Sequence, residues 1–165
     1  MKNLYKITIA IVVLNLFGIT YATANDFKPS TIDFDQDLNA SRLSLKQICE
    51  SIDEREFNPP EIPGTKESHV QLDCQGFMFE GQKRLAEFVF RDGKLALVWV
   101  LLDESVMDDM EVKMIKLLGE PSHVSAEFTA FSAKNAALIK EKTEVVFYAP
   151  MMSEMFDAWF ANPVM

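Results

Sequence analysis

Acid–base chemistry in this chain would depend on two histidines, His69 and His123, and on 25 acidic side chains. A histidine held beside an acid can act as a general base or ligate a metal. Both histidines, however, stand at the expected start of a strand. His69 has Glu67 and Asp73 near it in sequence, and His123 follows a Gly-Glu-Pro turn. We therefore expect two partly exposed structural histidines. A hydrolase in which they converge with two acids in a cleft is the alternative.

The carboxylates do not complete a recognisable metal or catalytic motif. Asp33-x-Asp35-x-Asp37 has the spacing that begins a calcium loop. Leu38 stands where such a loop needs glycine, and Ser44 where it needs glutamate. There is also no phosphate-binding glycine loop, dinucleotide fingerprint, zinc-protease motif or G-x-S-x-G element. The sequence thus predicts no catalytic residue, no metal and no cofactor.

The first 24 residues have the pattern of a secretory signal peptide. Lys2 and Lys6 flank the start of an apolar run over 7–17, and 22–24 (ATA) is a small-x-small cleavage site. The apolar run is shorter than the roughly 20 residues that span a bilayer. We expect a periplasmic or secreted mature chain, 25–165, with no membrane span once the signal is removed. An uncleaved membrane anchor is the alternative.

Removal of the signal peptide makes the charge more acidic. The full chain has 25 acidic and 16 basic side chains, a net charge of −9, and the signal contains two lysines and no acid. The mature chain therefore carries −11. This balance argues against nucleic-acid binding, which needs clustered Lys and Arg. It suits a basic protein partner, whose association rate would depend on salt.

Cys49 and Cys74 are the only cysteines. Together with two histidines they do not have the spacing of a zinc site. In an oxidising compartment such a pair indicates a disulfide, and two buried free thiols are the alternative. A nucleophilic role for Cys74 lacks a partner, because His69 is five residues away on a predicted strand and so faces the other side.

The elements that must position these residues follow from hydrophobic periodicity. Helices are expected over 41–56, 104–118 and 151–160. Strand patterns cover 70–79, 85–91, 95–102, 123–131 and 143–149. Asp92-Gly93 predicts a type I′ hairpin between two of them. Residues 132–142 fit either a short helix or a polar connection.

No internal repeat is visible, so we expect one domain over 41–165, preceded by an extended acidic lead-in over 25–40. The element order predicts an α+β fold, with a mostly antiparallel sheet of about five strands and two to four helices packed on it. The strand at 95–102 is apolar on both faces, which places it centrally and at least partly covered on both sides.

These features favour a small exported domain that binds an unidentified protein partner as an inhibitor, an immunity-type protein or an envelope accessory. The terminal helix offers candidate contact residues, Met152, Met155, Phe156 and Trp159, because thioethers and aromatic rings suit adaptable interfaces. The same stripe could instead close the core over the sheet. A small-ligand carrier is a further alternative, with a pocket lined by aromatic residues such as Trp99 or Phe88.

Overall fold

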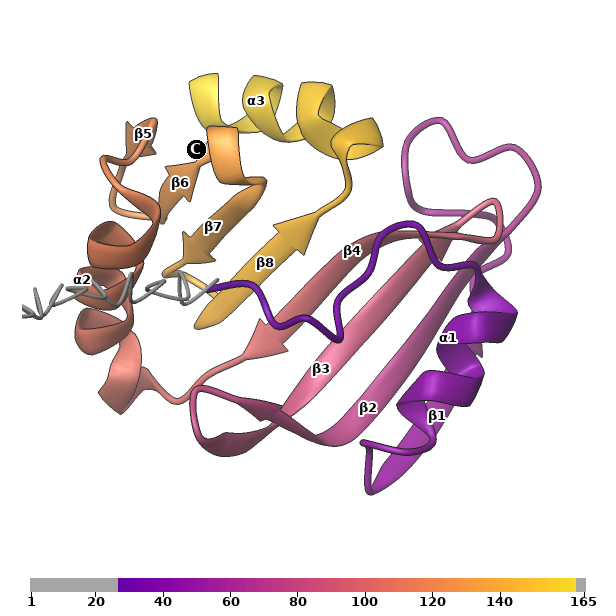
Figure 1. The fold of residues 1–165 in the computed structure, drawn as a ribbon. Coiled ribbons are helices and arrows are strands. Elements are labelled where there is room, and N and C mark those ends of the chain that lie inside the picture. Colours follow the sequence, from indigo (N-terminus) through magenta and orange to yellow (C-terminus); the bar gives the residue numbers. More distant parts are fainter. Residues whose placement is uncertain (1–26, 163–165) are drawn as a thin grey trace, which may run out of the picture.

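A continuous antiparallel sheet of eight strands runs through the part of the chain that the computed structural model describes, residues 27–162 (Figure 1). Its order is β1-β2-β3-β4-β8-β7-β6-β5. The strands are β1 Ser51–Glu56, β2 His69–Phe79, β3 Gln82–Arg91, β4 Lys94–Leu101, β5 His123–Val124, β6 Phe128–Phe131, β7 Ala136–Ile139 and β8 Glu144–Tyr148. The antiparallel α+β class is confirmed, but the predicted number of about five strands is wrong. The predicted signal peptide lies outside the described residues.

Helices cover the two faces of this sheet unequally. They are α1 Leu38–Leu45, α2 Met107–Leu118 and α3 Ser153–Ala161, with 3-10 turns η1 Glu104–Val106, η2 Ser132–Lys134 and η3 Pro150–Met152. One apolar cluster joins α1, α2 and residues 27–34 to the first face, and includes Phe27, Leu45 and Met114. A second cluster joins α3 to the other face through Phe156 and Phe160. The sheet is therefore packed on both sides.

The chain path repeats itself although the sequence does not. Helix α1 is followed by the meander β1–β4, and helix α2 by the meander β5–β8. The last strand of each meander pairs antiparallel with the other at the centre of the sheet, where Trp99 lies opposite Val146. Both helices pack on the same face. The two halves thus share one order of elements, a helix followed by a meander of four strands, although their strands differ in length.

The expected helix over 41–56 is wrong in its second half. The helix begins earlier, at Leu38, because the carboxylate of Asp37 caps it by accepting the N–H of Ala40 at 2.9 Å. It ends at Leu45, and Ser51–Glu56 forms β1, with Ile52 opposite Cys74 on β2. The charged sequence SIDERE gave no strand signal of its own. Pairing with β2 overrides local propensity there.

The hairpin predicted at Asp92-Gly93 is confirmed. Asp92 and Gly93 have φ angles of 51° and 75°, as a type I′ turn requires. The Asp92 carboxylate also accepts the N–H groups of residues 66–68, at 2.7–3.3 Å. These bonds lower the pKa of Asp92. They attach the end of the long loop between β1 and β2 to the β3–β4 turn, which matters for the site below.

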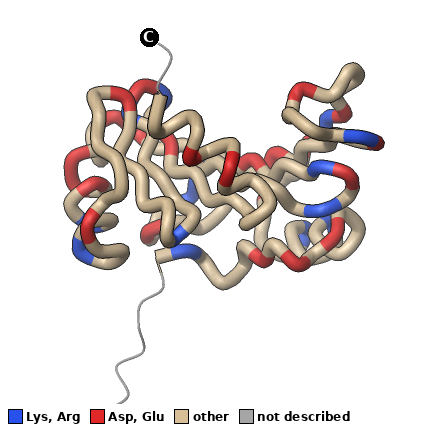
Figure 2. Tube along the Cα trace, turned by 90° about the horizontal axis from the view of Figure 1, so that it is seen from above, with Lys and Arg blue, Asp and Glu red and all other residues tan. Residues whose placement is uncertain are grey.

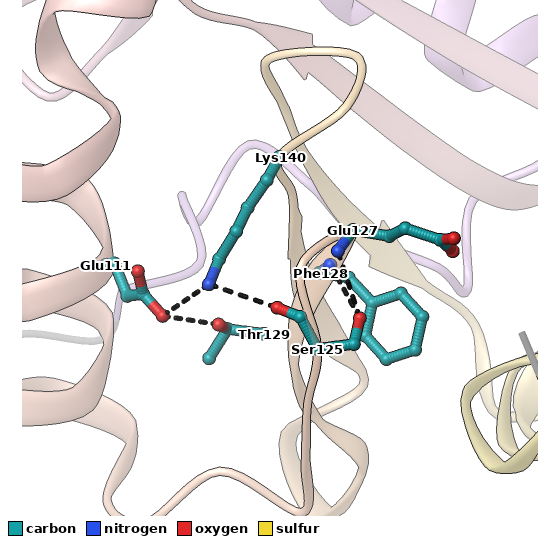
Figure 3. A network of polar contacts seen from close by, with 6 residues as sticks. All are labelled: Glu111, Ser125, Glu127, Phe128, Thr129 and Lys140. Atoms are coloured by element: carbon teal, nitrogen blue, oxygen red, sulfur yellow. Dashed lines mark hydrogen bonds and ion pairs between the residues drawn. The ribbon is translucent and has the colours of Figure 1, made fainter.

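The segment 123–142 contains three short strands. The single strand expected over 123–131 is interrupted because Ser125 Oγ accepts the N–H groups of Glu127 and Phe128, both at 3.1 Å (Figure 3). The ambiguous residues 132–142 form η2 and then β7, whose four residues are all buried. A strand of four apolar residues has no periodicity that could separate it from a helix.

A partly buried polar network joins α2 to this part of the sheet (Figure 3). Glu111 on α2 accepts the Thr129 hydroxyl at 2.5 Å and pairs with Lys140 Nζ at 2.9 Å. The Thr129 hydrogen bond, followed by the Lys140 contacts, lowers the pKa of Glu111. Thr129 is fully buried, so its hydroxyl needs this partner.

The disulfide between Cys49 and Cys74 is confirmed, with a Cα–Cα distance of 5.3 Å. It connects the turn after α1 to β2 across 25 positions of sequence, and Cys74 is fully buried. The bond therefore holds α1 and the edge strand β1 to the sheet.

We predict that the double variant C49A/C74A is about 3 kcal/mol less stable than the wild type, because the unfolded chain loses its cross-link. Urea unfolding should show a lower midpoint, and a reducing agent should lower the midpoint of the wild type only. Equal midpoints for the oxidised wild type and the variant would contradict this prediction.

Candidate functional site

The face of the sheet that carries α3 is only partly covered. Helix α3 packs over the second meander, and Ile62, in the loop over 57–68, packs against the same face from the other end. Figure 2, which views the molecule from above, shows this loop on the opposite side of the sheet from α1. Between α3 and the loop, the face of β2, β3 and β4 borders a groove of about 230 Å³.

The register of the strands places the side chains of this open face in rows. One row runs across the sheet through Arg55, Gln71, Val89 and Leu97. The next row runs through Asp53, Asp73, Glu87, Trp99 and Val146. Gln71, Val89, Leu97 and Trp99 form the floor of the groove, and Ile62, Pro63, His69 and Met155 border it. The groove thus has an apolar floor next to a charged row.

His69 is a buried polar group at the border of this groove. Its side chain is 4% exposed, and its ring stacks on Phe57 with the centroids 4.2 Å apart. Nδ1 accepts the N–H of Glu61 at 3.2 Å, and Nε2 has no hydrogen-bond partner. Because Nδ1 is the acceptor, the neutral ring carries its proton on Nε2. The expectation of a partly exposed His69 is wrong, since the loop over 57–68 covers the start of β2.

The charged row contains acids and no base of its own, and Arg55 of the neighbouring row pairs with it. Arg55 pairs with Asp73 at 2.8 Å and lies 3.5 Å from Glu87. Gln71 donates to Asp73 at 2.7 Å. Burial, and then the negative charge of Asp73, raise the pKa of Glu87 despite Arg55. One guanidinium therefore serves two carboxylates.

Glu144 lies across β4 from Glu87. It is opposite Leu101, which is two residues from Trp99 and so shares its face. Burial raises the pKa of Glu144; Lys142 opposes this effect, and Glu87 adds to it. Among the ion pairs of residues 27–162, none involves Glu144. Trp99 and Leu101 thus lie between two half-buried carboxylates.

The candidate contact residues of the terminal helix fall into two pairs. Met152 and Phe156 are each 1% exposed and belong to the second core cluster, where Phe156 stacks on Tyr148. Met155 and Trp159 are partly exposed, and Met155 borders the groove. The helix therefore closes the core over the sheet. Contact of Met155 and Trp159 with a partner stays a prediction.

The residues that a hydrolase site or a small-ligand pocket would need do not lie together in the structure. Five strands separate β2, which carries His69, from β5, which carries His123. The two rings are consequently several strand spacings of roughly 4.8 Å apart. Phe88 packs in the first core cluster, whereas Trp99 faces the groove on the other side. Within 27–162, no three His, Cys, Asp or Glu side chains are grouped as metal ligands would be.

Comparisons of the chain with protein-family models, curated proteins and solved structures found no match. In the described part of the chain, no helix combines the length and apolar character needed to cross a membrane.

We predict that His69 makes folding sensitive to mildly acidic pH. Burial lowers the pKa of His69, and the charge of Glu61 opposes this only in part. The unfolded chain therefore binds the proton more readily, so stability is full above the usual histidine pKa of about 6.5 and falls as pH drops below it.

Urea unfolding of the wild type and of His69→Phe at pH 7.5 and pH 6.0 checks this prediction. The phenylalanine preserves an aromatic ring against Phe57 but does not titrate. The midpoint of the variant should change less between the two pH values. An equal change in both proteins would show that His69 is not the responsible group.

Proposed function

We propose that this protein is an exported domain that binds a protein partner through the open face of its sheet, between α3 and the loop over 57–68. The observation that carries the proposal is the groove itself, whose largely apolar floor adjoins the row of carboxylates at Asp53, Asp73 and Glu87. An inhibitor, an immunity-type protein or an envelope accessory would each work in this way.

The size of the groove favours protein side chains over a free small molecule. Sites for small ligands typically have about 300–1,000 Å³ and enclose most of the ligand. The groove here has about 230 Å³ and is bordered on one side by a loop and on the other by a helix. It suits one or two side chains of a larger partner.

The disulfide supports export. Such bonds persist in oxidising compartments and are rare in a reducing cytosol. Cys49–Cys74 also fastens the edge strand β1, which carries Arg55 and Asp53 of the open face. Oxidation therefore stabilises the part of the sheet that we assign to the partner.

We predict that the mature protein begins at Asn25, because residues 22–24 form the cleavage site. N-terminal sequencing of protein recovered from the periplasm or the medium of an expressing bacterium tests this. Recovery of a chain that still begins at Met1 would argue for a membrane anchor.

We predict that a photoreactive amino acid at Met155 cross-links to a partner in intact cells, because Met155 borders the groove. The matched control places the same amino acid at Val112, which is 67% exposed. Val112 belongs to α2, and that helix packs on the other face of the sheet. The cross-link at position 155 should weaken when salt is raised, since the surface is acidic.

The comparison between the two positions decides the result. Cross-linking from position 155 and not from position 112 supports the open face as the interface. Equal yields at both positions, or a yield at position 112 alone, would count against it.

A further inference from the structure

We propose that two copies of this chain pair edge to edge through β1, antiparallel and centred on Glu54, so that Asp53 of each copy lies opposite Arg55 of the other. This interface is separate from the groove and does not depend on the proposed function.

Strand β1 is an open edge of the sheet. It stands first in the strand order, so in the described part of the chain one of its sides has no neighbouring strand. Five of its six residues are exposed, and only Ile52 is half-buried. The main-chain donors and acceptors along such an edge are available to another strand.

The pairing of β1 with β2 determines which main-chain groups point outwards. The N–H of Phe57 donates to the carbonyl of His69 at 2.9 Å, which makes these two residues a hydrogen-bonded pair of the antiparallel ladder. Such pairs alternate along the ladder, so every second residue of β1 before Phe57 also bonds to β2. The N–H and C=O groups of the residues in between therefore point away from the sheet. These residues are Ile52, Glu54 and Glu56.

One register gives this edge complementary charges. A two-fold axis normal to the sheet keeps each face of β1 on its own side, and an axis at Glu54 joins outward-pointing groups to one another. Glu54 then bonds to its counterpart, and Ile52 to Glu56 of the other copy. Asp53 lies opposite Arg55 of the other copy in a non-hydrogen-bonded pair, with Cβ atoms about 4.5–5.5 Å apart. Moving the axis by one residue places Asp53 opposite Asp53, or Arg55 opposite Arg55.

The two side chains have the capacity for this contact. Asp53 has no ion pair within residues 27–162, and it lies opposite Asp73 of its own chain. Arg55 contacts Asp73 and Glu87 through Nη2. Its Nε and Nη1 groups are further donors of the same planar fork. A contact with Asp53 of the other copy therefore adds to the Asp73 contact and does not replace it.

The pairing also brings Glu54 close to its counterpart on the other face of the sheet. Arg42 of α1 reduces the repulsion, because its Nε donates to Glu54 at 2.9 Å and its Nη2 pairs with the second oxygen. Each Glu54 thus reaches the axis with a cation of its own chain. Charged edge strands usually resist pairing, but here the register turns the charges of Asp53 and Arg55 into an attraction.

Sedimentation equilibrium of the oxidised mature protein tests the dimer. We expect a reversible monomer–dimer equilibrium whose dissociation constant rises with salt. Asp53→Arg should weaken the dimer about tenfold, because it opposes two like charges on each side of the axis. Glu104→Arg makes the same change in net charge at an exposed residue next to α2 and should change the dissociation constant less than twofold.

The charge-swapped variant D53R/R55D should restore the dimer to within about twofold of the wild type. Its arginine again lies opposite an aspartate of the other copy, and it also lies opposite Asp73 of its own chain. The fingerprint NMR spectrum of each variant shows whether the fold is retained. If the swapped variant does not fold, the comparison of Asp53→Arg with Glu104→Arg and the measurement of register below decide the result.

NMR of a mixed sample of labelled and unlabelled wild type measures the register. We expect nuclear Overhauser effects between copies that connect the α-protons of Asp53 and Arg55, since Cα atoms in a non-hydrogen-bonded pair are about 4.5 Å apart. Amide exchange of Ile52, Glu54 and Glu56 should slow as the protein concentration rises.

Three results would overturn the inference. They are a monomer at every concentration up to about 1 mM, equal effects of Asp53→Arg and Glu104→Arg, or contacts between copies that do not involve β1. A chain that stays monomeric and pairs this edge with a different protein would overturn it too. None of these results bears on the cross-link from Met155, because the residues that line the groove do not include β1.

Discussion

The antiparallel pairing of β4 with β8 is the interaction on which the rest of this structure depends. It joins two meanders that each consist of four strands and a preceding helix, and neither meander alone would bury both faces of its last strand. Strand β4 is apolar on both faces, with Val98 fully buried on one face and Leu97 6% exposed on the other. Cover is therefore needed on both sides of the sheet.

The candidate site lies where that cover ends. On one face, α1, α2 and the segment before α1 complete the core. On the other face, α3 covers the second meander and reaches the first only at β4, where the rings of Phe156 and Trp99 have centroids 6.3 Å apart. Ile62, in the loop over 57–68, packs against this face from the other side. Trp99 and the rest of the groove floor lie between α3 and this loop. The groove therefore exists because α3 is too short to cover this whole face of the sheet.

The sheet surface beside the groove is acidic. The row through Asp53, Asp73 and Glu87 places three carboxylates on neighbouring strands, where like charges repel. Arg55 relieves only part of that repulsion. A sheet face needed only for stability would gain from apolar or oppositely charged neighbours at these positions.

Local signals in the sequence were sufficient for several elements. Asp92-Gly93 specified its hairpin because a type I′ turn needs two positive φ angles. The stretch 104–118 specified a helix through its apolar stripe and its terminal Gly119. The strand β1 could not be predicted, since SIDERE forms a strand only because β2 pairs with it. The four-residue β7 was too short to show a period.

The sequence by itself determined the local elements with strong periodicity or turn chemistry, the one possible disulfide pairing and the excess of acid, because each depends on residue types and near neighbours. Only the tertiary structure decided that His69 is buried, that His69 and His123 are on distant strands, and that Glu87, Trp99 and Glu144 share one face. Those relations depend on strand register and on which face each helix covers. Both are set by pairings between residues far apart in the chain.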